Sequence, residues 1–277
     1  MHTIDGLPSH ILPNPSEVVC WGVWAGGGHL SPFQTKAVRT GVRHPPVGFI
    51  LSAAMAMITP ILACTDWEEY QRLRVILRQH QNAAVKTISG FTFRKCAKTF
   101  GMLDGNKLML ESESELTILM DFCIYSHRQK RTLMEKYLAK LPPTDDADEK
   151  VVREAMSQSR YSMYRIEKII QGSGLHVHDL VRGNRLFLVD ETLSKTLKTG
   201  ALLGGRLIPL PGYWITTGAC FPLSEEVVED VEEVFLRALK MTEGDVSSLS
   251  AEAEEELAAV VIGAAMEDGT TSMVDYQ

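Results

Sequence analysis

The sequence predicts an α+β protein with a helical N-terminal half, a small antiparallel β-sheet or barrel, and acidic helices at the C-terminus. Residues 161–223 support the sheet, because short apolar runs alternate there between turn signals. Longer runs with helical spacing of apolar residues precede this segment. Residues 225–277 contain 15 Asp and Glu but 2 Lys and Arg, whereas residues 1–224 carry a net charge of +6. The net negative charge of the chain therefore comes from its C-terminal part.

The N-terminal residues 1–64 are predicted to form a poorly ordered leader with one apolar segment. They are rich in Gly, Pro, His and Ser and show no sustained period. The apolar segment, residues 47–64, is shorter than the roughly 20 residues of a membrane-spanning helix and contains Pro60. We expect no membrane span, and a mis-assigned translation start is an alternative explanation of the leader.

Residues 65–141 are predicted to form a helical region, and residues 142–149 a linker that begins with two prolines. Helices are expected at residues 67–84 and 92–100, with an extended piece at 107–110. Ser112 and Glu115 match the capping-box pattern at the start of a helix that continues to about residue 139, with a basic interruption at 127–131. Asp146 or Asp148 then begins a helix that ends near residue 158.

Residues 150–242 are predicted to be a small β module with flanking helices, and residues 243–277 an acidic helix and tail. The five expected strands cover residues 164–170, 175–181, 186–189, 202–210 and 213–217. Their short, regular spacing is typical of an antiparallel sheet or small barrel. Ser224 is expected to cap a helix that extends to residue 240.

The strand segment contains a recognisable order of residues. Asp179-Leu180, Gly183, residues 186–190, Ser194, Gly200, residues 206–210 and residues 212–219 carry it. This pattern, with the helical region at 108–125, resembles an uncharacterised bacterial protein family that shares the β-rich module accompanying SEC-C motif proteins. The resemblance covers residues 92–223 and implies no established activity. The Cys/His metal cluster of SEC-C is absent, so metal binding is not implied.

The side-chain chemistry favours a non-enzymatic interaction or regulatory protein of the bacterial cytoplasm, with a protein as its partner. The five cysteines are dispersed and form no CxxC motif, which fits a reducing compartment. No G-x-S-x-G motif or paired acid–base carboxylates are present. We therefore expect no cofactor.

One alternative is a single-stranded nucleic-acid-binding protein. Basic and aromatic side chains are interleaved in the β module, as in proteins that stack bases and contact phosphates. The candidate binding residues are Arg182, Arg185, Arg206, Tyr213 and Trp214. In this hypothesis the acidic C-terminal helix, through residues 252–256, masks the basic surface.

A second alternative is a metal-dependent enzyme that uses His176 and His178. Residues two apart on a strand share one face, so the two imidazoles would point the same way. A metal site would need a third ligand, such as Cys220.

Overall fold

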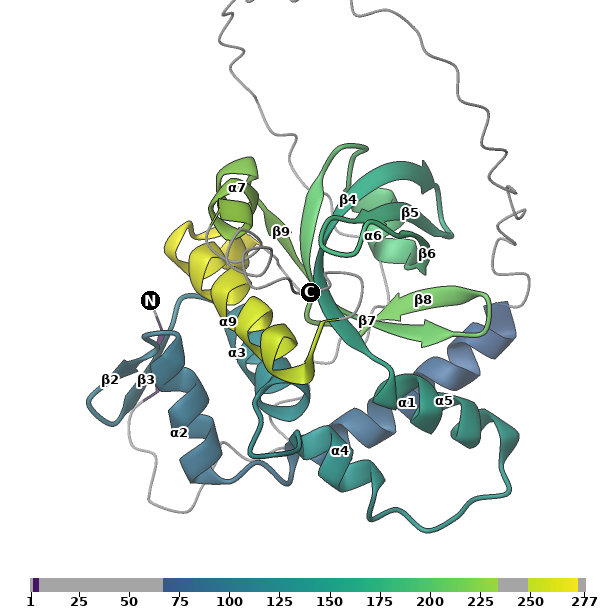
Figure 1. The fold of residues 1–277 in the computed structure, drawn as a ribbon, viewed down its shortest axis with the longest axis horizontal. Helices are drawn as coiled ribbons and strands as arrows, with labels where there is room; N and C mark the ends of the chain where they lie inside the picture. The colour runs from purple at the N-terminus through teal and green to yellow at the C-terminus, as the bar shows by residue number, and fades with distance from the viewer. Residues whose placement is uncertain (1, 5–66, 234–248, 274–277) are drawn as a thin grey trace, which may run out of the picture.

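The computed structural model describes residues 2–4, 67–233 and 249–273 (Figure 1). A closed five-stranded barrel lies at its centre. Its strands are β4 (Arg160–Ile170), β5 (Gly174–Asp179), β6 (Arg185–Val189), β7 (Leu202–Leu210) and β8 (Tyr213–Thr216). All five predicted strands are confirmed, and a short sixth strand, β9 (Phe221–Leu223), pairs with β7. The α+β fold class is therefore confirmed.

The strand order around the barrel is β4-β5-β6-β8-β7, and pairing of β7 with β4 closes it. Four pairings are antiparallel, but β6 and β8 run parallel, with Leu188 opposite Trp214. This parallel pair departs from the antiparallel prediction. It arises because helix α6 (Glu191–Thr196) leads the chain from β6 across to β7, so that β8 returns beside β6 in the same direction.

Alternating side chains fill the barrel interior, as the pleat of a strand requires. The interior cluster consists of Tyr164, Ile166, Leu175, Val177, Leu186, Leu188, Leu203, Leu207 and Cys220. Leu193 of α6 packs against the same cluster, so this helix covers one end of the barrel. Gly205 on β7 allows the close approach of Cys220, because a Cβ at this position would lie 2.4 Å from the Cys220 Sγ.

Helices and helical turns lie outside the barrel. They are α1 (Trp67–Val85), α2 (Gly90–Thr99), α3 (Glu113–Asp121), the π-helical turn η1 (Phe122–Ser126), α4 (Leu133–Leu138), α5 (Ala147–Ser157), α7 (Glu225–Val231), α9 (Ala251–Glu267) and the 3₁₀ turn η3 (Thr270–Met273). A small antiparallel sheet, β1 (His2–Ile4), β3 (Lys107–Leu110) and β2 (Leu103–Asp104), lies beside α2. In Figure 1 the barrel occupies the upper right, α1, α4 and α5 lie below it, and α9 lies to its left.

Two features of the helical region differ from the predictions. The helix expected over residues 112–139 is broken between Ser126 and Leu133, where the basic interruption lies. The reciprocal capping box expected at Ser112 and Glu115 forms instead at Thr132 and Glu135. Ser112 still accepts a bond from the Glu115 amide, but the Glu115 carboxylate accepts from Glu111 N–H. Asp146 caps α5, which begins at Ala147 within the predicted linker.

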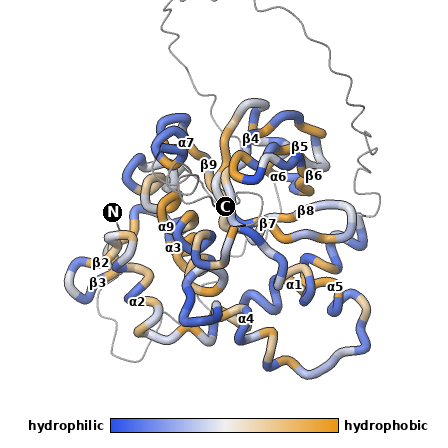
Figure 2. Tube along the Cα trace, in the orientation of Figure 1, coloured by the Kyte–Doolittle hydropathy of each residue, from blue (hydrophilic) through white to orange (hydrophobic). Residues whose placement is uncertain are grey.

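The main core joins the helices to the outer side of the barrel. Helix α9 contributes Leu257, Ala258, Val261, Ile262 and Ala265, each at most 1% exposed. Figure 2 shows this apolar content as orange along much of α9, whereas α7 is largely blue. The acidic C-terminal helix is therefore an integral part of the hydrophobic core and not an appendage.

Some predictions fall outside the described residues. They are most of the leader at 1–64, including its apolar segment, the end of the helix expected to reach residue 240, and the last four residues. Within the described ranges, no helix combines the length and apolarity needed to traverse a lipid bilayer.

Candidate functional site

The predicted binding residues Arg182 and Arg206 lie inside the protein. Arg206 on β7 is 2% exposed, and the side chain of Arg182, which follows β5, is 5% exposed. Both meet Glu254 near the start of α9. Arg206 Nη1 donates to Glu254 Oε1 at 2.8 Å, and Arg182 Nη2 donates to Glu254 Oε2 at 2.9 Å. One carboxylate therefore holds two guanidinium groups, and neither group is presented to a ligand in this state.

Other polar groups complete this buried arginine cluster. Ser126 of η1 accepts a 2.8 Å hydrogen bond from Arg206 Nη2, and Asp121 Oδ2 lies 3.8 Å from Arg206 Nε. Arg182 also donates to the Tyr161 carbonyl at 2.9 Å. Asp179, fully buried, accepts bonds from the Ser162 hydroxyl and from the amides of residues 181 and 182. The cluster thus ties α9 and η1 to three barrel strands, β4, β5 and β7.

Burial and opposite charges act against each other in this cluster. Burial raises the pKa of Asp121 to about 6, although the nearby Arg206 acts in the opposite direction. Burial works against the charge of Arg206, but the carboxylates of Glu254 and Asp121 outweigh it, so the pKa of Arg206 rises. Arg206 therefore stays charged, and the carboxyl of Asp121, with its pKa of about 6, changes protonation in mildly acidic solution.

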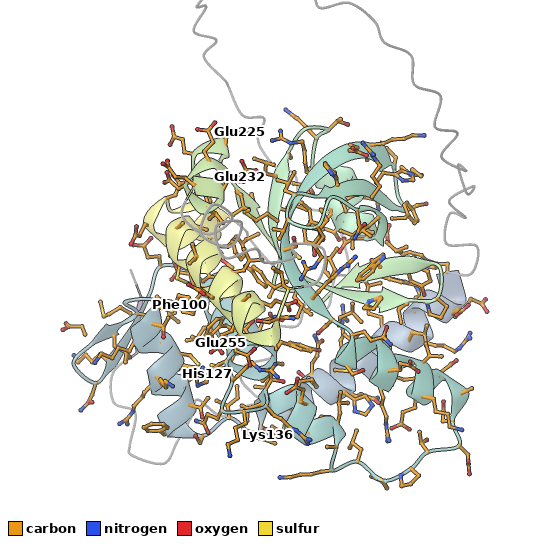
Figure 3. All side chains as sticks on the ribbon, viewed as in Figure 1. Phe100, His127, Lys136, Glu225, Glu232 and Glu255 are labelled. Atoms are coloured by element: carbon orange, nitrogen blue, oxygen red, sulfur yellow. The ribbon has the colours of Figure 1, made fainter. Side chains whose placement is uncertain are left out.

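A second contact fixes the start of α9. The Glu255 carboxylate lies 3.0 Å from His127 Nδ1 and accepts a 3.2 Å bond from the Arg128 backbone N–H. Figure 3 shows Glu255 and His127 side by side between α9 and the segment that precedes α4. Adjacent glutamates of α9 thus bind two different parts of the fold, Glu254 the barrel and Glu255 the helix break.

The predicted aromatic residues are not an exposed stacking platform. Tyr213 on β8 is 6% exposed and its ring lies 6.5 Å from that of Tyr70 on α1. Trp214 is half-buried, packs against the barrel interior and lies under the Arg160 guanidinium at 4.2 Å. Both rings therefore contribute to packing around β8.

The predicted residues Arg185, His176 and His178 lie together on the outside of the barrel. Strand pairing places Lys168 beside His176, and Arg165 and Arg185 on either side of His178. We call Arg165, Lys168, His176, His178 and Arg185 the outer barrel face. Arg185 is 70% exposed and pairs with Glu167 at 2.9 Å, and Arg165 pairs with Glu225 at 3.0 Å. Burial, and then the charge of Lys168, lowers the pKa of His176.

The third metal ligand suggested for the histidines is in the wrong place. Cys220 belongs to the barrel interior, whereas His176 and His178 point outward because they alternate with the interior residues Leu175 and Val177. In the portion of the chain that the structure describes, no group of three or more His, Cys, Asp or Glu residues could hold a metal ion.

A pocket of about 430 Å³ lies between α1 and one end of the barrel. One face of α1 lines it with Trp67, Gln71, Arg74, Arg78 and Gln81. The opposite wall consists of residues 190–193 at the start of α6 and residues 216–218 with Cys220 after β8. Its volume lies within the range of small-molecule sites, roughly 300–1,000 Å³.

Specific contacts hold the polar groups of this pocket in place. Arg74 Nη1 donates to the Thr216 carbonyl at 3.1 Å, and Gln81 Nε2 donates to the Thr217 carbonyl at 3.1 Å. Asp190 caps α6 by accepting from the Leu193 amide at 2.9 Å, and burial raises its pKa. Arg78 completes the wall beside Arg74.

Sequence reasoning missed Arg74 and Arg78 as pocket residues. Their signal is the spacing of residues 67, 71, 74, 78 and 81, which repeats every three or four positions and defines one helix face. The partner wall comes from residues more than 100 positions away, so no local pattern could show that this face borders a cavity.

Comparisons with known proteins place the chain in a family. The model of a family of unknown function, DUF7986, matches residues 65–252 of the 277. No curated protein and no solved structure matches the chain. Nothing in these comparisons links the chain to SEC-C motif proteins. The match spans the helices, the barrel and the first two residues of α9, and the chain belongs to this family of unknown function.

Proposed function

We propose that this chain is a cytoplasmic bacterial interaction or regulatory protein that is not an enzyme, and that the outer barrel face contacts its protein partner. The supporting observation is the exposure of this face. Arg185 and Lys168 are exposed, and His176 and His178 are half-buried. In Figure 1 this part of β4, β5 and β6 points away from α1, α5 and α9, which cover other sides of the barrel.

The face is suited to a partner with an acidic patch. It carries three permanent cations and two histidines, and the carboxylates that pair with Arg165 and Arg185 are themselves partly solvent-exposed. Exposed ion pairs contribute little to stability and can exchange partners at a low free-energy cost. Complementary charges on a partner would mainly increase the association rate and the specificity.

An affinity capture from the native host tests this proposal. The full chain is compared with the double variant Lys168→Glu/Arg185→Glu and with Lys150→Glu, an exposed charge reversal on α5. We expect one or more proteins to be retained by the wild type and by Lys150→Glu but lost with the double variant. Equal retention by all three proteins would exclude the outer barrel face.

The strand order favours a second candidate, binding of single-stranded nucleic acid. The spatial order β4-β5-β6-β8-β7 is the connectivity of an OB-fold. Helix α6 lies between β6 and β7, the third and fourth barrel strands along the chain, as the helix of an OB-fold does. OB-folds bind oligonucleotides on the face of their second and third strands, which here are β5 and β6. Shared connectivity alone does not assign a function, and the cations of the outer barrel face are the second supporting feature.

This candidate predicts salt-dependent binding that needs Lys168 and Arg185. Fluorescence anisotropy of labelled single-stranded RNA and DNA should show binding that weakens steeply with salt. The double variant should bind more weakly, and Lys150→Glu should bind as the wild type does. No binding at low salt would exclude the candidate.

The hypothesis that α9 masks a nucleic-acid-binding surface is best tested with a point substitution and not with a truncation. Removing α9 would expose main-core residues such as Leu257 and Val261, so loss of folding would hide any change in binding. Glu254→Gln removes the negative charge between Arg182 and Arg206 and keeps the side-chain shape. Tighter binding of nucleic acid by this variant would support masking, and unchanged binding would contradict it.

A further inference from the structure

Two cations of α1 converge on the pocket between this helix and the barrel. Arg74 and Arg78 are four residues apart, so their side chains lie on the same face. Arg74 uses one nitrogen to donate to the Thr216 carbonyl. Within the described ranges, no carboxylate forms an ion pair with either guanidinium, and the side chain of Arg78 makes no hydrogen bond.

The described residues compensate the charge of Arg78 only in part. Burial lowers the pKa of Arg78, and the like charge of Arg74 lowers it further. The buried acid Asp190 attracts both guanidinium groups electrostatically but forms an ion pair with neither of them, and its carboxylate caps α6 through the Leu193 amide. Glu191, also in the wall, pairs with Lys195. The pocket therefore retains guanidinium hydrogen-bond donors that face its interior and that the described residues do not use.

A flat apolar surface adjoins the two cations. The rings of Trp67 and Tyr70 stack with their centroids 4.8 Å apart, and the Arg74 guanidinium lies 5.9 Å from the Tyr70 ring. Trp67 is 38% exposed at the pocket wall, which leaves a ring surface open to a ligand. Indole rings bind other planar groups through stacking.

We propose that this pocket binds a small anion attached to a planar ring, with Arg74 and Arg78 holding the oxyanion and Trp67 packing against the ring. The oxyanion is a carboxylate or a phosphate, since a guanidinium matches both in bidentate geometry. The site is separate from the outer barrel face, and the proposal goes beyond partner binding by that face.

The proposal is tested with the full chain by isothermal titration calorimetry and thermal unfolding. The probes are adenosine 5′-monophosphate, benzoate and inorganic phosphate, with adenosine and benzamide as uncharged controls. We expect saturable binding of at least one ring-bearing anion and none of its uncharged counterpart. A response to the phosphate ester alone or to benzoate alone identifies the oxyanion, and no binding of any anion overturns the proposal.

Substitution of Arg78 separates a ligand-binding role from a structural one. Arg78→Gln should weaken anion binding by at least about tenfold, because charge-assisted bonds are lost. Without ligand, the same variant should unfold at the same temperature as the wild type or a higher one, because burial of the cation and its repulsion from Arg74 are relieved. If Arg78 had a structural role, the substitution would instead lower the unfolding temperature, and that result would overturn the proposal.

Two further variants complete the test. Arg72→Gln is the matched control, since Arg72 lies on the same helix but pairs with Asp148 on the exposed side, and it should bind like the wild type. Trp67→Ala should weaken binding of the ring-bearing anion and leave any binding of inorganic phosphate unchanged. Equal affinities of the wild type and Arg78→Gln, or of the wild type and Trp67→Ala, would overturn the corresponding contact.

Discussion

Glu254 on α9 and Arg206 on β7 form an ion pair with a 2.8 Å contact, and the arginine side chain is only 3% exposed. The second oxygen of Glu254 binds Arg182, and its first oxygen also accepts from the Tyr161 amide. The C-terminal helix is therefore attached to the barrel through one carboxylate with three donors. Breaking a buried pair by removing one partner leaves an uncompensated charge, which is costly.

We expect Glu254→Ala to lower the free energy of unfolding by about 3 kcal/mol, because Arg182 and Arg206 would both lose their shared carboxylate. Urea denaturation measures the change. Glu256→Ala is the matched control, since Glu256 is exposed on the same helix, and it should change the stability by less than about 0.5 kcal/mol. Equal stability of the two variants would show that the cluster does not hold α9.

The stability of the protein should fall as the pH rises through the range from about 4 to 6. The pKa of Asp121 is raised from 3.8 to about 6 in the folded state, so within this range the folded protein binds a proton that the unfolded chain has released. The unfolding free energy is then larger at the acidic end, by an amount on the order of 2–3 kcal/mol.

Asp121→Asn isolates this contribution from other titrating groups. The wild type should lose more stability than the variant between pH 4 and pH 6.5 in urea denaturation. Asp104→Asn, an exposed substitution in β2, should retain the wild-type pH dependence. Identical pH profiles for the wild type and Asp121→Asn would show that the carboxyl titrates normally.

Gly205→Ala should destabilise the barrel by more than about 2 kcal/mol. Gly205 has φ 153°, and a Cβ would lie 2.4 Å from Cys220 Sγ and 2.9 Å from Cys220 Cα. Gly183→Ala separates backbone strain from the clash, because Gly183 has φ 73° but a Cβ added there would meet no heavy atom within 4 Å. Its cost should be about 1–2 kcal/mol, and an equal cost for both variants would contradict the steric explanation.

The strands could be predicted because their signals are local. Alternation and turn residues define β4 to β8, and Gly172, Gly183, Gly200 and Gly212 at their junctions all have positive φ. The closure of the barrel could not be predicted in this way. The pairings of β4 with β7 and of β6 with β8 join residues distant in sequence, and no local pattern encodes them.

In the candidate sites too, local features could be predicted from the sequence, and contacts between distant residues could not. The sequence marked Arg182 and Arg206 as candidate binding residues, but both are buried against Glu254. Glu254 lies 48 positions after Arg206, within an acidic run of similar residues. Glu254 could not be distinguished from Glu252 or Glu256 by sequence. The placement of His176 and His178 on one face of their strand was correctly inferred, because it depends only on strand alternation.

The position of the capping box gives a further measurable prediction. In the Thr132–Glu135 box, Thr132 Oγ1 accepts from the Glu135 amide at 3.1 Å, and Glu135 Oε2 accepts from the Thr132 amide at 2.8 Å. Arg128 Nη2 also donates to the Glu135 carboxylate. At Ser112 only the first of these bonds is present, and it is longer, at 3.4 Å.

Thr132→Ala should therefore lower the free energy of unfolding by about 1–2 kcal/mol, and Ser112→Ala by less. A double-mutant cycle with Glu135→Ala should give a coupling of about 0.5 kcal/mol or more with Thr132→Ala, because the two side chains cap reciprocally. The equivalent cycle of Ser112→Ala with Glu115→Ala should give a coupling near zero, since Glu115 bonds to the Glu111 amide. A larger coupling at Ser112 than at Thr132 would reverse the assignment of the box.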